Sequence, residues 1–367
     1  MIANNFLITM ITAVVSMLLY NPIRSLYLSI KLVDVPNWQK LSSSSVPLGG
    51  GMIIVLSFFI GSVLSRVIFP DSPELFAVLY IGIVVMFASG TIDDAYDMRA
   101  IAKFFIQFVL SVITILSSDL LLIDLNGLFG IQELPEFLAW PLTVIYFLVF
   151  INMFNLSDGI DGLALSLGLV GFIFLAGTMV ISGNLNLLLV IQILMGSIVV
   201  LLVNNYKWDK MYLGDAGALT LGYISGVLIL KSLTSTDFIL PDINYTNFAP
   251  IYAMTIFWYP LFDLVRVFTL RLYRKKSPFS PDRTHLHHLL VDRGYSHLFV
   301  TVLISILSIC LSLLSFYFSK IFSLYLSQTL AVNLLFVFMV IICWLVAYLL
   351  FVGWPLNLLP PKKEIPK

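Results

Sequence analysis

Long apolar stretches run through almost the whole chain and constrain its fold more than any other feature. About eleven of them reach the roughly 20 residues that a helix needs to cross the hydrocarbon core of a bilayer. Sixty per cent of the 367 residues are hydrophobic and 11% are charged, whereas soluble domains carry about 25% charged residues. The mean hydropathy is +1.01, which excludes a water-soluble core. We predict an all-α polytopic membrane protein.

The expected membrane helices are, in chain order, 3–22, 47–69, 76–91, 101–118, 137–153, 163–182, 186–204, 213–233, 248–270, 297–319 and 328–352. Pro22, Pro70, Pro135 and Pro355 lie near expected helix ends, where a missing backbone donor does least harm. Pro260 lies inside the ninth stretch, and we expect it to break or kink that helix. The first stretch lacks the basic segment and cleavage site of a signal peptide, so we expect a retained first span.

Lysines and arginines are distributed unevenly between the two sets of loops. One set carries only Arg66, Lys231 and Lys320, and almost all other basic residues lie on the opposite set. Because cytoplasmic loops are enriched in Lys and Arg, we expect the N-terminus outside and the C-terminus, with a tail over 354–367, in the cytoplasm. The polar loop 271–297 is then cytoplasmic as well.

The polar stretch 152–163 lies between two apolar stretches and contains Asn152, Asn155, Asp158 and Asp161. Ionised carboxylates are costly in hydrocarbon unless they are paired or hydrated. We therefore expect this stretch at a helix end or in a polar cavity on the cytoplasmic side. A polar turn that only joins two helices is the alternative interpretation.

Two further acidic clusters are expected on the same side. Asp93, Asp94 and Asp97 follow the third apolar stretch, and Asp215 begins the eighth. Neighbouring carboxylates repel one another unless a cation or a proton neutralises them. The alternatives are a solvated acidic turn for the first cluster and a helix N-cap for Asp215. Tyr212, three residues before Asp215, is either a site residue or an interfacial anchor.

The loop 271–297 contains three of the four histidines, namely His285, His287 and His288. Zinc binding is one interpretation of such a cluster. The neighbouring Arg283 and two upstream lysines favour an anion instead, so a phosphate-binding loop is the preferred interpretation. A basic loop that contacts anionic lipid head groups is the third alternative.

The acidic clusters can bind a divalent cation, and the Arg/His loop can bind phosphate oxygens. This combination is typical of enzymes that catalyse phosphoryl transfer. A site of this kind at a membrane surface indicates that one substrate is a lipid phosphate. A secondary transporter is the rival class, and it predicts charges near the bilayer midplane and two related halves, which this sequence does not suggest.

From about residue 31 to 294 the chain resembles the polyprenyl-phosphate N-acetylhexosamine-1-phosphate transferases. Their superfamily includes the phospho-muramoyl-pentapeptide translocase of peptidoglycan synthesis. The histidine motif is similar to the branch that uses UDP-N-acetylglucosamine. The motifs that carry the resemblance are Leu32-Val-Asp34-x-Pro36-Asn37, Pro47-Leu-Gly-Gly50-Gly51, Asp93-Asp94, Asn152-x-x-Asn155-x-x-Asp158-Gly-x-Asp161-Gly, Gly214-Asp215-Ala-Gly217 and Ser277-Pro-Phe-Ser-Pro-Asp-Arg-x-His285-x-His287-His288.

The resemblance implies a catalytic centre made by three aspartates. Asp215 matches the magnesium ligand of the family, with Mn²⁺ as a possible substitute. Asp93 and Asp94 match the pair that positions or deprotonates the lipid phosphate and assists the metal. The reaction it implies is attack of undecaprenyl phosphate on UDP-N-acetylglucosamine with release of UMP, either by direct displacement or through an aspartyl-phosphate intermediate.

The resemblance also implies a nucleotide site. Asp158 and Asp161 match its carboxylates, with Asp161 nearer to uracil, and Asn155 and Asn205 match polar residues that line it. Tyr212 matches an aromatic residue that stacks on the uracil ring.

The remaining residues that the resemblance assigns lie in and near the histidine loop. His285, His287 and His288, with Arg283, match the loop that contacts the sugar-phosphate end of the donor. The broken ninth span, with Asp263 and Arg266, would border the groove for the prenyl chain.

For the chain as a whole, the resemblance implies one integral membrane transferase domain over 1–367 in the bacterial cytoplasmic membrane. It further implies a short extracytoplasmic hairpin near 121–134, a homodimer, no nucleic-acid partner, and a role in starting a cell-wall polymer, lipopolysaccharide or teichoic acid. One segment departs from the family pattern. Between Asn37 and Pro47 Lys40 is the only cation, and a serine run at 42–45 stands where relatives carry several basic residues. If those charges hold the nucleotide or the lipid phosphate in relatives, Lys40 is the substrate-binding cation here, or another segment compensates. This departure bears on the donor sugar more than on the reaction type.

Overall fold

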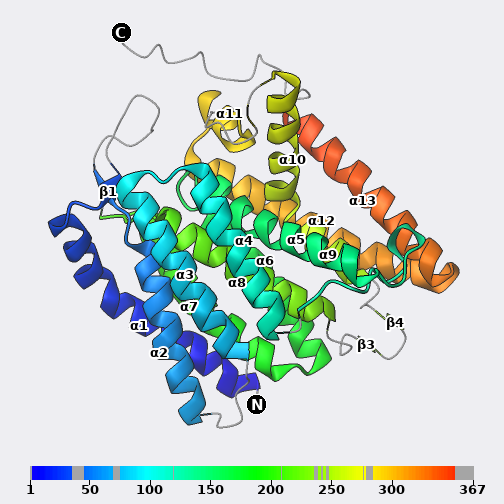
Figure 1. Cartoon of the computed structure of the whole chain (residues 1–367), viewed down its shortest axis with the longest axis horizontal. Coiled ribbons are helices and arrows are strands. Elements are labelled where there is room, and N and C mark those ends of the chain that lie inside the picture. The colour runs from blue at the N-terminus through cyan, green and yellow to red at the C-terminus, as the bar shows by residue number, and fades with distance from the viewer. Residues whose placement is uncertain are drawn as a thin grey trace.

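The computed structural model describes residues 2–34, 45–68, 75–118, 120–207, 209–234, 239–240, 243–244, 248–275, 277 and 284–351. Lys40, Arg283, most of the serine run and the tail over 354–367 lie outside the described residues. The long helices form one bundle (Figure 1). The helices are α1 (Ile2–Ser29), α2 (Gly50–Ile68), α3 (Leu75–Tyr96), α4 (Ala100–Ser118), α5 (Glu136–Ser157), α6 (Leu163–Ser182), α7 (Leu185–Asn205), α8 (Gly214–Thr234), α9 (Ala249–Ile256), α10 (Trp258–Tyr273), α11 (Leu286–Asp292), α12 (His297–Tyr325) and α13 (Gln328–Phe351).

Ten of these helices are long and apolar enough to cross a membrane, and the number rises to eleven if the bent pair of α9 and α10 is counted as one span. The expected architecture of about eleven spans is therefore confirmed. The limits expected for 163–182 coincide with α6. In the loop expected over 271–297, the structure contains the short helix α11.

Of two expectations for prolines, the one for Pro22 is wrong and the broken ninth stretch at Pro260 is confirmed. Pro22 lies inside α1, which continues to Ser29 instead of ending near residue 22. A proline removes only one backbone hydrogen bond there, and membrane helices tolerate such a loss when neighbouring groups compensate. The ninth span bends by 81° between Ile256 and Trp258, ahead of Pro260. Pro260 is then in the first turn of α10, where a backbone N–H has no intrahelical partner.

The apolar side chains form two hydrophobic clusters. The first surrounds α8, whose membrane-spanning window is 83% buried, and includes residues of α1 to α7. The second is formed mainly by α9 to α13. Ile160 and Leu163, in the turn between α5 and α6 and at the start of α6, belong to the second cluster. This turn therefore connects the two halves of the bundle.

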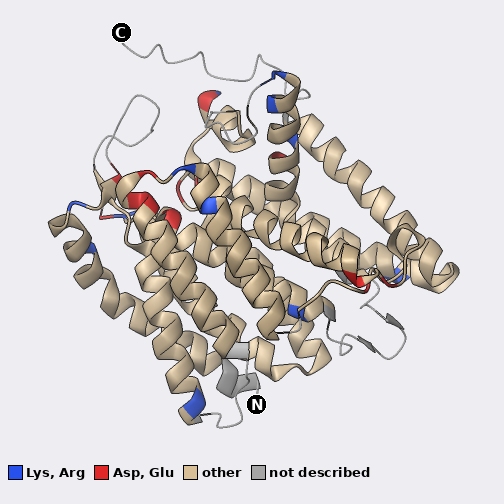
Figure 2. Ribbon diagram, viewed as in Figure 1, with Lys and Arg blue, Asp and Glu red and all other residues tan. Residues whose placement is uncertain are grey.

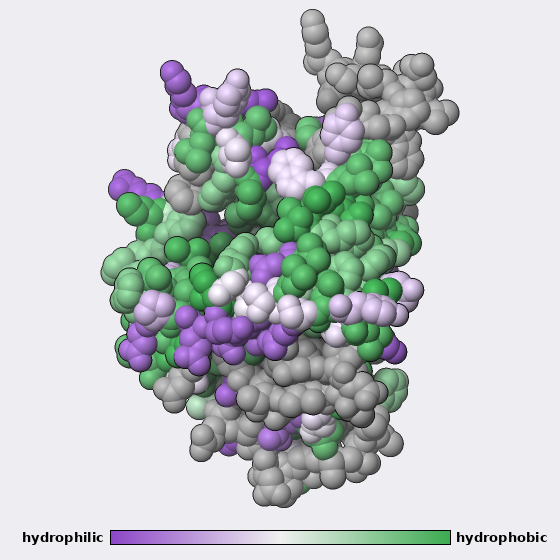
Figure 3. Space-filling model, turned by 90° about the vertical axis from the view of Figure 1, so that its right-hand side faces the viewer, coloured by the Kyte–Doolittle hydropathy of each residue, from purple (hydrophilic) through white to green (hydrophobic). Residues whose placement is uncertain are grey.

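The surface divides into apolar and polar zones. Figure 3 shows a broad apolar area on one side of the molecule, with polar residues above it and in a band below it. In Figure 2, charged residues gather mainly at the end of the bundle where β1, α11 and the C-terminal part of α10 lie. Helix α1 starts at the opposite end, and α13 finishes at the charged end (Figure 1). This distribution is typical of a multi-pass membrane protein whose charged residues gather at one end of the helix bundle.

Short antiparallel ladders and one hairpin complete the fold. The ladders pair β1 (Val33–Asp34) with β2 (Val46–Pro47), and β3 (Ile239–Leu240) with β4 (Ile243–Asn244). The expected hairpin near 121–134 is present, with a bridge between Asp124 and Glu133 and the 3₁₀ turn η1 (Leu128–Gly130) at its tip. Asn333 of α13 holds this tip, because its side chain donates to the carbonyl of Gly127 and accepts from the amide of Phe129, both at 2.8 Å.

Candidate active site

A polar cavity of about 770 Å³ opens at the charged end of the bundle. It is bordered by the ends of α3 and α7, the turn after α5, the start of α8, the β1 strand, α11 and the start of α12. Eight of the residues singled out in the sequence line it, and they are Asp93, Asp94, Asp158, Asp161, Asn205, Tyr212, Asp215 and His288. The tertiary structure thus brings together polar clusters that are separated by long apolar helices in the chain.

Glycines allow three helices to meet at the floor of this cavity. A Cβ atom on Gly51 of α2 would lie 2.5 Å from the backbone nitrogen of Gly217 in α8. A Cβ atom on Gly90 of α3 would overlap the backbone of Ala216. Since only glycine leaves room for such contacts, these positions bring α2 and α3 against the first turn of α8. Asp94, one turn after Gly90, is thereby placed beside Asp215.

Asp94 caps α8 from another helix. The backbone N–H of Asp215 donates to Oδ1 of Asp94 at 2.9 Å, and that of Ala216 donates to Oδ2 at 3.2 Å. The first N–H groups of a helix lack intrahelical partners and favour a nearby negative charge. Asp94 therefore fixes α3 to α8, and the N-cap considered for Asp215 is supplied by Asp94 instead.

Lys103 of α4 lies between two of the aspartates. Its Nζ is paired with the Asp93 carboxylate and lies 3.4 Å from Oδ2 of Asp215. The other Asp215 oxygen accepts a hydrogen bond from Nδ2 of Asn155 at 2.9 Å. Asn155 thus reaches the site by contacting Asp215, although it is not among the residues that line the cavity. Sequence reasoning did not assign Lys103 to the site, although it is the one cation in the apolar α4.

Asp93 and Asp215 differ in their access to the cavity. The Asp93 side chain is 2% exposed and also accepts from the backbone N–H of Met98 at 2.8 Å. The Asp215 side chain is 35% exposed. Of the two carboxylates that contact Lys103, Asp215 is therefore the one that a ligand can reach without rearrangement.

Asp158 lies where several negative charges accumulate. Burial, and then the charges of Asp215, Asp94 and Asp161, raise the pKa of Asp158 well above the ordinary value of a carboxyl. This local excess of negative charge is what a bound cation would relieve.

The acidic residues fit a magnesium ion that is shared with a substrate. No group of three or more His, Cys, Asp or Glu among the described residues forms a ready metal site. Magnesium, however, is usually bound by one or two carboxylates together with waters and substrate phosphates. The open Asp215 carboxylate, in this crowded acidic environment, has the donor chemistry for that arrangement.

Asp161 is held by two basic side chains that the sequence did not assign to the site. Its Oδ2 lies 3.0 Å from Nζ of Lys210 and 3.2 Å from Nδ1 of His297. Burial alone would raise the pKa of Asp161, but hydrogen bonds from His297 and Lys210, and the charges of both, lower it below the usual range. The Asp161 carbonyl also accepts from the hydroxyls of Tyr206 at 2.8 Å and Thr301 at 3.0 Å. The turn between α5 and α6 is thus tied to α7 and α12.

Tyr212 forms part of the cavity wall. Its N–H donates to the carbonyl of Pro47, and its own carbonyl accepts from the N–H of Gly50, both at 2.9 Å. Nζ of Lys210 lies 4.9 Å from the centre of the Tyr212 ring. Asn205 lies nearby. Its side-chain nitrogen donates to the carbonyl of Met211 at 3.1 Å, and its buried Oδ1 has no hydrogen-bond partner in the part of the chain that the structure describes. An aromatic ring and a free amide oxygen are therefore available at this side of the cavity.

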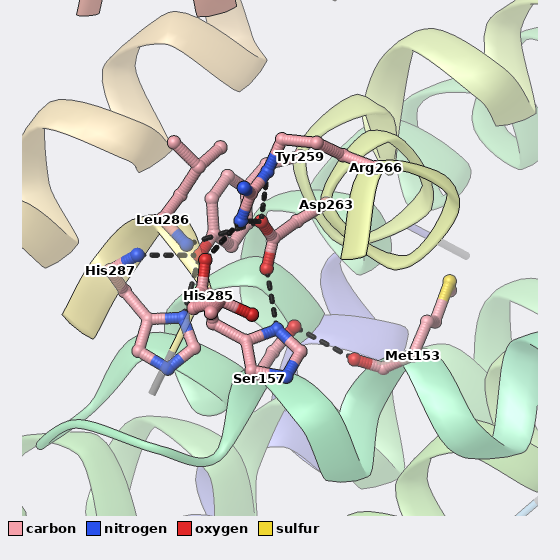
Figure 4. A network of polar contacts seen from close by, with 9 residues as sticks. Met153, Ser157, Tyr259, Asp263, Arg266, His285, Leu286 and His287 are labelled. Atoms are coloured by element: carbon pink, nitrogen blue, oxygen red, sulfur yellow. Dashed lines mark hydrogen bonds and ion pairs between the residues drawn. The ribbon is translucent and has the colours of Figure 1, made fainter. Parts of the chain in front are cut away.

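The histidine loop, residues 284–288, packs against one face of α10 (Figure 4). His285 is 6% exposed and His287 is fully buried, and neither lines the cavity, whereas His288 does. Asp263 and Arg266, which were expected near a prenyl groove, lie beneath this loop. Oδ2 of Asp263 is 2.7 Å from Nδ1 of His285, and Oδ1 of Asp263 accepts from Arg266.

The histidine loop contacts the turn between α5 and α6. The rings of His287 and His288 are 4.3 Å apart, and both lie against Gly159. A Cβ atom on Gly159 would overlap the His287 ring and lie 2.9 Å from Nε2 of His288. The histidines therefore support the wall that carries Asp158 and Asp161, and only His288 also faces the cavity.

Comparison with known proteins gives consistent matches. Residues 76–233 match the family described as glycosyl transferase family 4. The chain is 29% identical over 293 residues to a "Probable undecaprenyl-phosphate N-acetylglucosaminyl 1-phosphate transferase" of Bacillus subtilis, covering 79% of this chain and 78% of that protein.

Two enterobacterial relatives, each an "Undecaprenyl-phosphate alpha-N-acetylglucosaminyl 1-phosphate transferase", are similar to the same degree. The protein of Yersinia pestis is 28% identical over 297 residues, covering 79% of this chain and 78% of the relative. The protein of Escherichia coli strain K12 is 28% identical over 314 residues, covering 82% and 81%. These matches confirm the resemblance that the motifs indicated, to the polyprenyl-phosphate N-acetylhexosamine-1-phosphate transferases.

Proposed function

We propose that this protein transfers N-acetylglucosamine 1-phosphate from UDP-N-acetylglucosamine to undecaprenyl phosphate, giving undecaprenyl-diphosphate-N-acetylglucosamine and UMP. The observation that carries the proposal is the convergence of Asp93, Asp94, Asp158, Asp161 and Asp215 on one cavity at one end of a membrane-spanning bundle. The names of the relatives agree with it. In the reaction, an oxygen of the lipid phosphate bonds to the β-phosphorus of the donor. The bond between that phosphorus and the bridging oxygen breaks, and UMP leaves with this oxygen.

The lipid phosphate is proposed to bind beside Asp93 and Lys103. Lys103 already lies between Asp93 and Asp215, so its ammonium can hold a phosphate oxygen in place of one carboxylate. A phosphomonoester has a second pKa near 6 and is largely ionised at neutral pH. Asp93 and Asp94 can therefore position the nucleophile and α8 without acting as a general base. A direct displacement is the preferred form of the reaction.

Magnesium is proposed to bind at Asp215, with Asp93 or Asp94 as a secondary contributor and Mn²⁺ as a substitute. A bound Mg²⁺ would neutralise charge on the diphosphate and on the departing UMP. Asn155 contributes by orienting Asp215, since it donates to the carboxylate oxygen that Lys103 does not contact.

The nucleotide is proposed to occupy the side of the cavity between Tyr212 and Asp161. The Tyr212 ring can stack on uracil, and the free Asn205 oxygen can accept a hydrogen bond from it. Lys210, which now pairs with Asp161, adds positive charge for the diphosphate, and the His297 ring lies beside the same carboxylate. His288 borders the cavity, and Arg283 is proposed to join it at the sugar-phosphate end.

We further propose that the cavity faces the cytoplasm, in the cytoplasmic membrane of a bacterium, and that the protein is a homodimer. The uneven distribution of Lys and Arg supports this orientation. The product would start a surface glycopolymer such as a wall polymer, lipopolysaccharide or teichoic acid.

The test is a transfer assay on the purified full-length protein with undecaprenyl phosphate and a panel of radiolabelled UDP-sugars, each with and without Mg²⁺. We expect labelled lipid diphosphate and UMP from UDP-N-acetylglucosamine, and loss of both products with a chelator. Transfer from another UDP-N-acetylhexosamine instead would keep the reaction and change the donor. Absence of lipid-linked product with every donor would refute the proposal.

A further inference from the structure

One face of α10 holds four successive residues of the histidine loop. Tyr259, Asp263 and Arg266 are spaced at i, i+4 and i+7, so their side chains leave α10 in the same direction. Arg266 donates to the carbonyl of Thr284, Asp263 contacts His285 and Leu286, and Tyr259 contacts His287. Figure 4 shows the α10 side chains pointing toward His285, Leu286 and His287. The loop therefore takes its shape from α10.

Asp263 determines the proton position on His285. The carboxylate lies within hydrogen-bond distance of Arg266 at 2.7 Å and of the Leu286 N–H at 3.1 Å, both through Oδ1. Its Oδ2 lies 2.7 Å from Nδ1 of His285. A carboxylate beside a guanidinium is ionised and can only accept hydrogen bonds. Nδ1 of His285 must therefore carry a proton.

Tyr259 imposes the opposite arrangement on His287. The Tyr259 hydroxyl accepts from the backbone N–H of His287 at 3.2 Å and lies 2.7 Å from Nδ1 of the same residue. Among the described residues, Nδ1 is the one acceptor within reach of the hydroxyl proton of this buried tyrosine. Because buried donors are almost always satisfied, the hydroxyl donates to Nδ1, which is then unprotonated.

We infer that α10 fixes opposite proton positions at Nδ1, protonated in His285 and unprotonated in His287, and that Tyr259 is a positioning residue for the proposed transfer. His287 then carries its proton on Nε2, a fully buried atom that has no hydrogen-bond partner among the described residues and lies against Gly159. The second part of this inference rests on the proposed function, and the first part does not.

The surroundings of His287 agree with a neutral ring. Burial, and next the positive charge that a protonated His288 would carry, lower the pKa of His287 well below its ordinary value. A neutral imidazole with a fixed tautomer keeps one nitrogen as donor and the other as acceptor. The turn that carries Asp158 and Asp161 therefore rests on a ring whose orientation is set from α10.

Nitrogen NMR of the full-length protein with ¹⁵N-labelled histidine tests the tautomers directly, since the chain contains only four histidines. His285→Asn and His287→Gln variants assign the signals. We expect a protonated Nδ1 for His285, and for His287 an unprotonated Nδ1 with a protonated Nε2. In Tyr259→Phe, the His287 signals should change to a mixture of tautomers. A protonated Nδ1 on His287 in the wild type, or unchanged signals in Tyr259→Phe, would overturn the inference.

Kinetics test the positioning role, with a matched control in the other half of the same broken span. Tyr252 of α9 is also buried and donates to Ser319 at 2.6 Å, away from the histidine loop. We expect Tyr259→Phe to lower kcat roughly tenfold with little change in KM, because one buried hydrogen bond and the fixed ring are lost. Tyr252→Phe should change kcat by no more than about twofold.

The outcomes separate the two parts of the inference. Equal kcat values for Tyr259→Phe and Tyr252→Phe would refute the positioning role, even if the His287 tautomer changes as expected. If the wild type transfers no sugar phosphate, the proposed function fails, while the NMR result still decides the tautomers.

Discussion

The acidic wall (Asp93, Asp94, Asp158 and Asp215) and the histidine loop border the same cavity but are built in opposite ways. The acidic wall concentrates negative charge, and its members are held by backbone amides, an asparagine and Lys103. The histidine loop contains potential cations, yet two of its three histidines are buried and tied to α10. Ionised side chains are therefore concentrated on the acidic wall, whereas the histidine loop consists mainly of buried side chains in fixed positions.

The comparison indicates how the two regions should respond to substitution. The acidic wall lies at the ends of α3, α5 and α8, whose apolar residues belong to the cluster around α8, and its open carboxylate, Asp215, can contact a ligand directly. The histidine loop belongs to the second cluster and acts on the cavity mainly through Gly159 and the adjoining turn. A change at Asp215 should abolish chemistry without loss of fold, whereas changes at the loop should act through packing.

Asp215→Asn should have the largest effect. The amide keeps the shape and can still accept from Asn155, but it loses the negative charge that a metal and a diphosphate require. We expect transfer to fall by about 10³-fold, the range seen when one electrostatic contact to a transition state is removed. The melting temperature in detergent should stay close to that of the wild type. Near-normal turnover in this variant would refute the role of Asp215.

Gly159→Ala should damage the contact between the turn and the histidine loop. The added methyl group would overlap the His287 ring and crowd His288, and the fully buried His287 ring cannot move freely. Overpacking of this kind costs about 1–3 kcal/mol, so we expect a lower melting temperature and a loss of transfer on the order of tenfold.

Gly177→Ala is the matched control for this substitution. Gly177 lies in α6, and a Cβ atom there would meet nothing within 4 Å among the described residues. It should leave transfer unchanged. If the two variants behave alike, the close packing at Gly159 has no functional consequence.

Tyr212→Ala should raise KM for the UDP-sugar by about tenfold, because stacking on an aromatic ring contributes about 1 kcal/mol or more to binding. Tyr212→Phe keeps the ring and should retain the wild-type KM. A KM that does not change in Tyr212→Ala would indicate that Tyr212 is an interfacial anchor. Steady-state kinetics with varied donor distinguish these results.

Lys210→Met should have the smallest effect, on stability at acid pH. Since the pKa of Asp161 is lowered in the folded state, its stabilisation is present above the unfolded carboxyl value of about 4 and is lost as the pH falls through the lowered value. Without Lys210, the free energy of unfolding that is lost on acidification should be smaller by about 1 kcal/mol or less. The effect is small because the Lys210–Asp161 pair is partly exposed and His297 still contacts Asp161. The difference is measured from the melting temperatures of the wild type and the variant between about pH 5 and pH 3. An unchanged pH profile would show that Lys210 does not determine the pKa of Asp161.

Much of the fold and part of the site followed from the sequence. Hydropathy identified the spans, because the cost of placing polar groups in hydrocarbon acts on each segment of about 20 residues separately. The recurrence of carboxylates at one set of helix ends predicted Asp93, Asp94, Asp158, Asp161 and Asp215 as neighbours, and all five line the cavity.

The partners of these carboxylates were decided only by the tertiary structure. These partners include Lys103, Lys210 and His297. Each contacts an aspartate that lies far from it in the sequence, and no local sequence pattern distinguishes these residues from other basic residues. The sequence likewise grouped His285, His287 and His288, and could not show that α10 buries two of them and leaves the third at the cavity. Hydropathy and motif spacing are local properties of the chain. Burial, pairing and proton position depend on which helices meet, and here glycine contacts such as that of Gly90 with α8 determine that meeting.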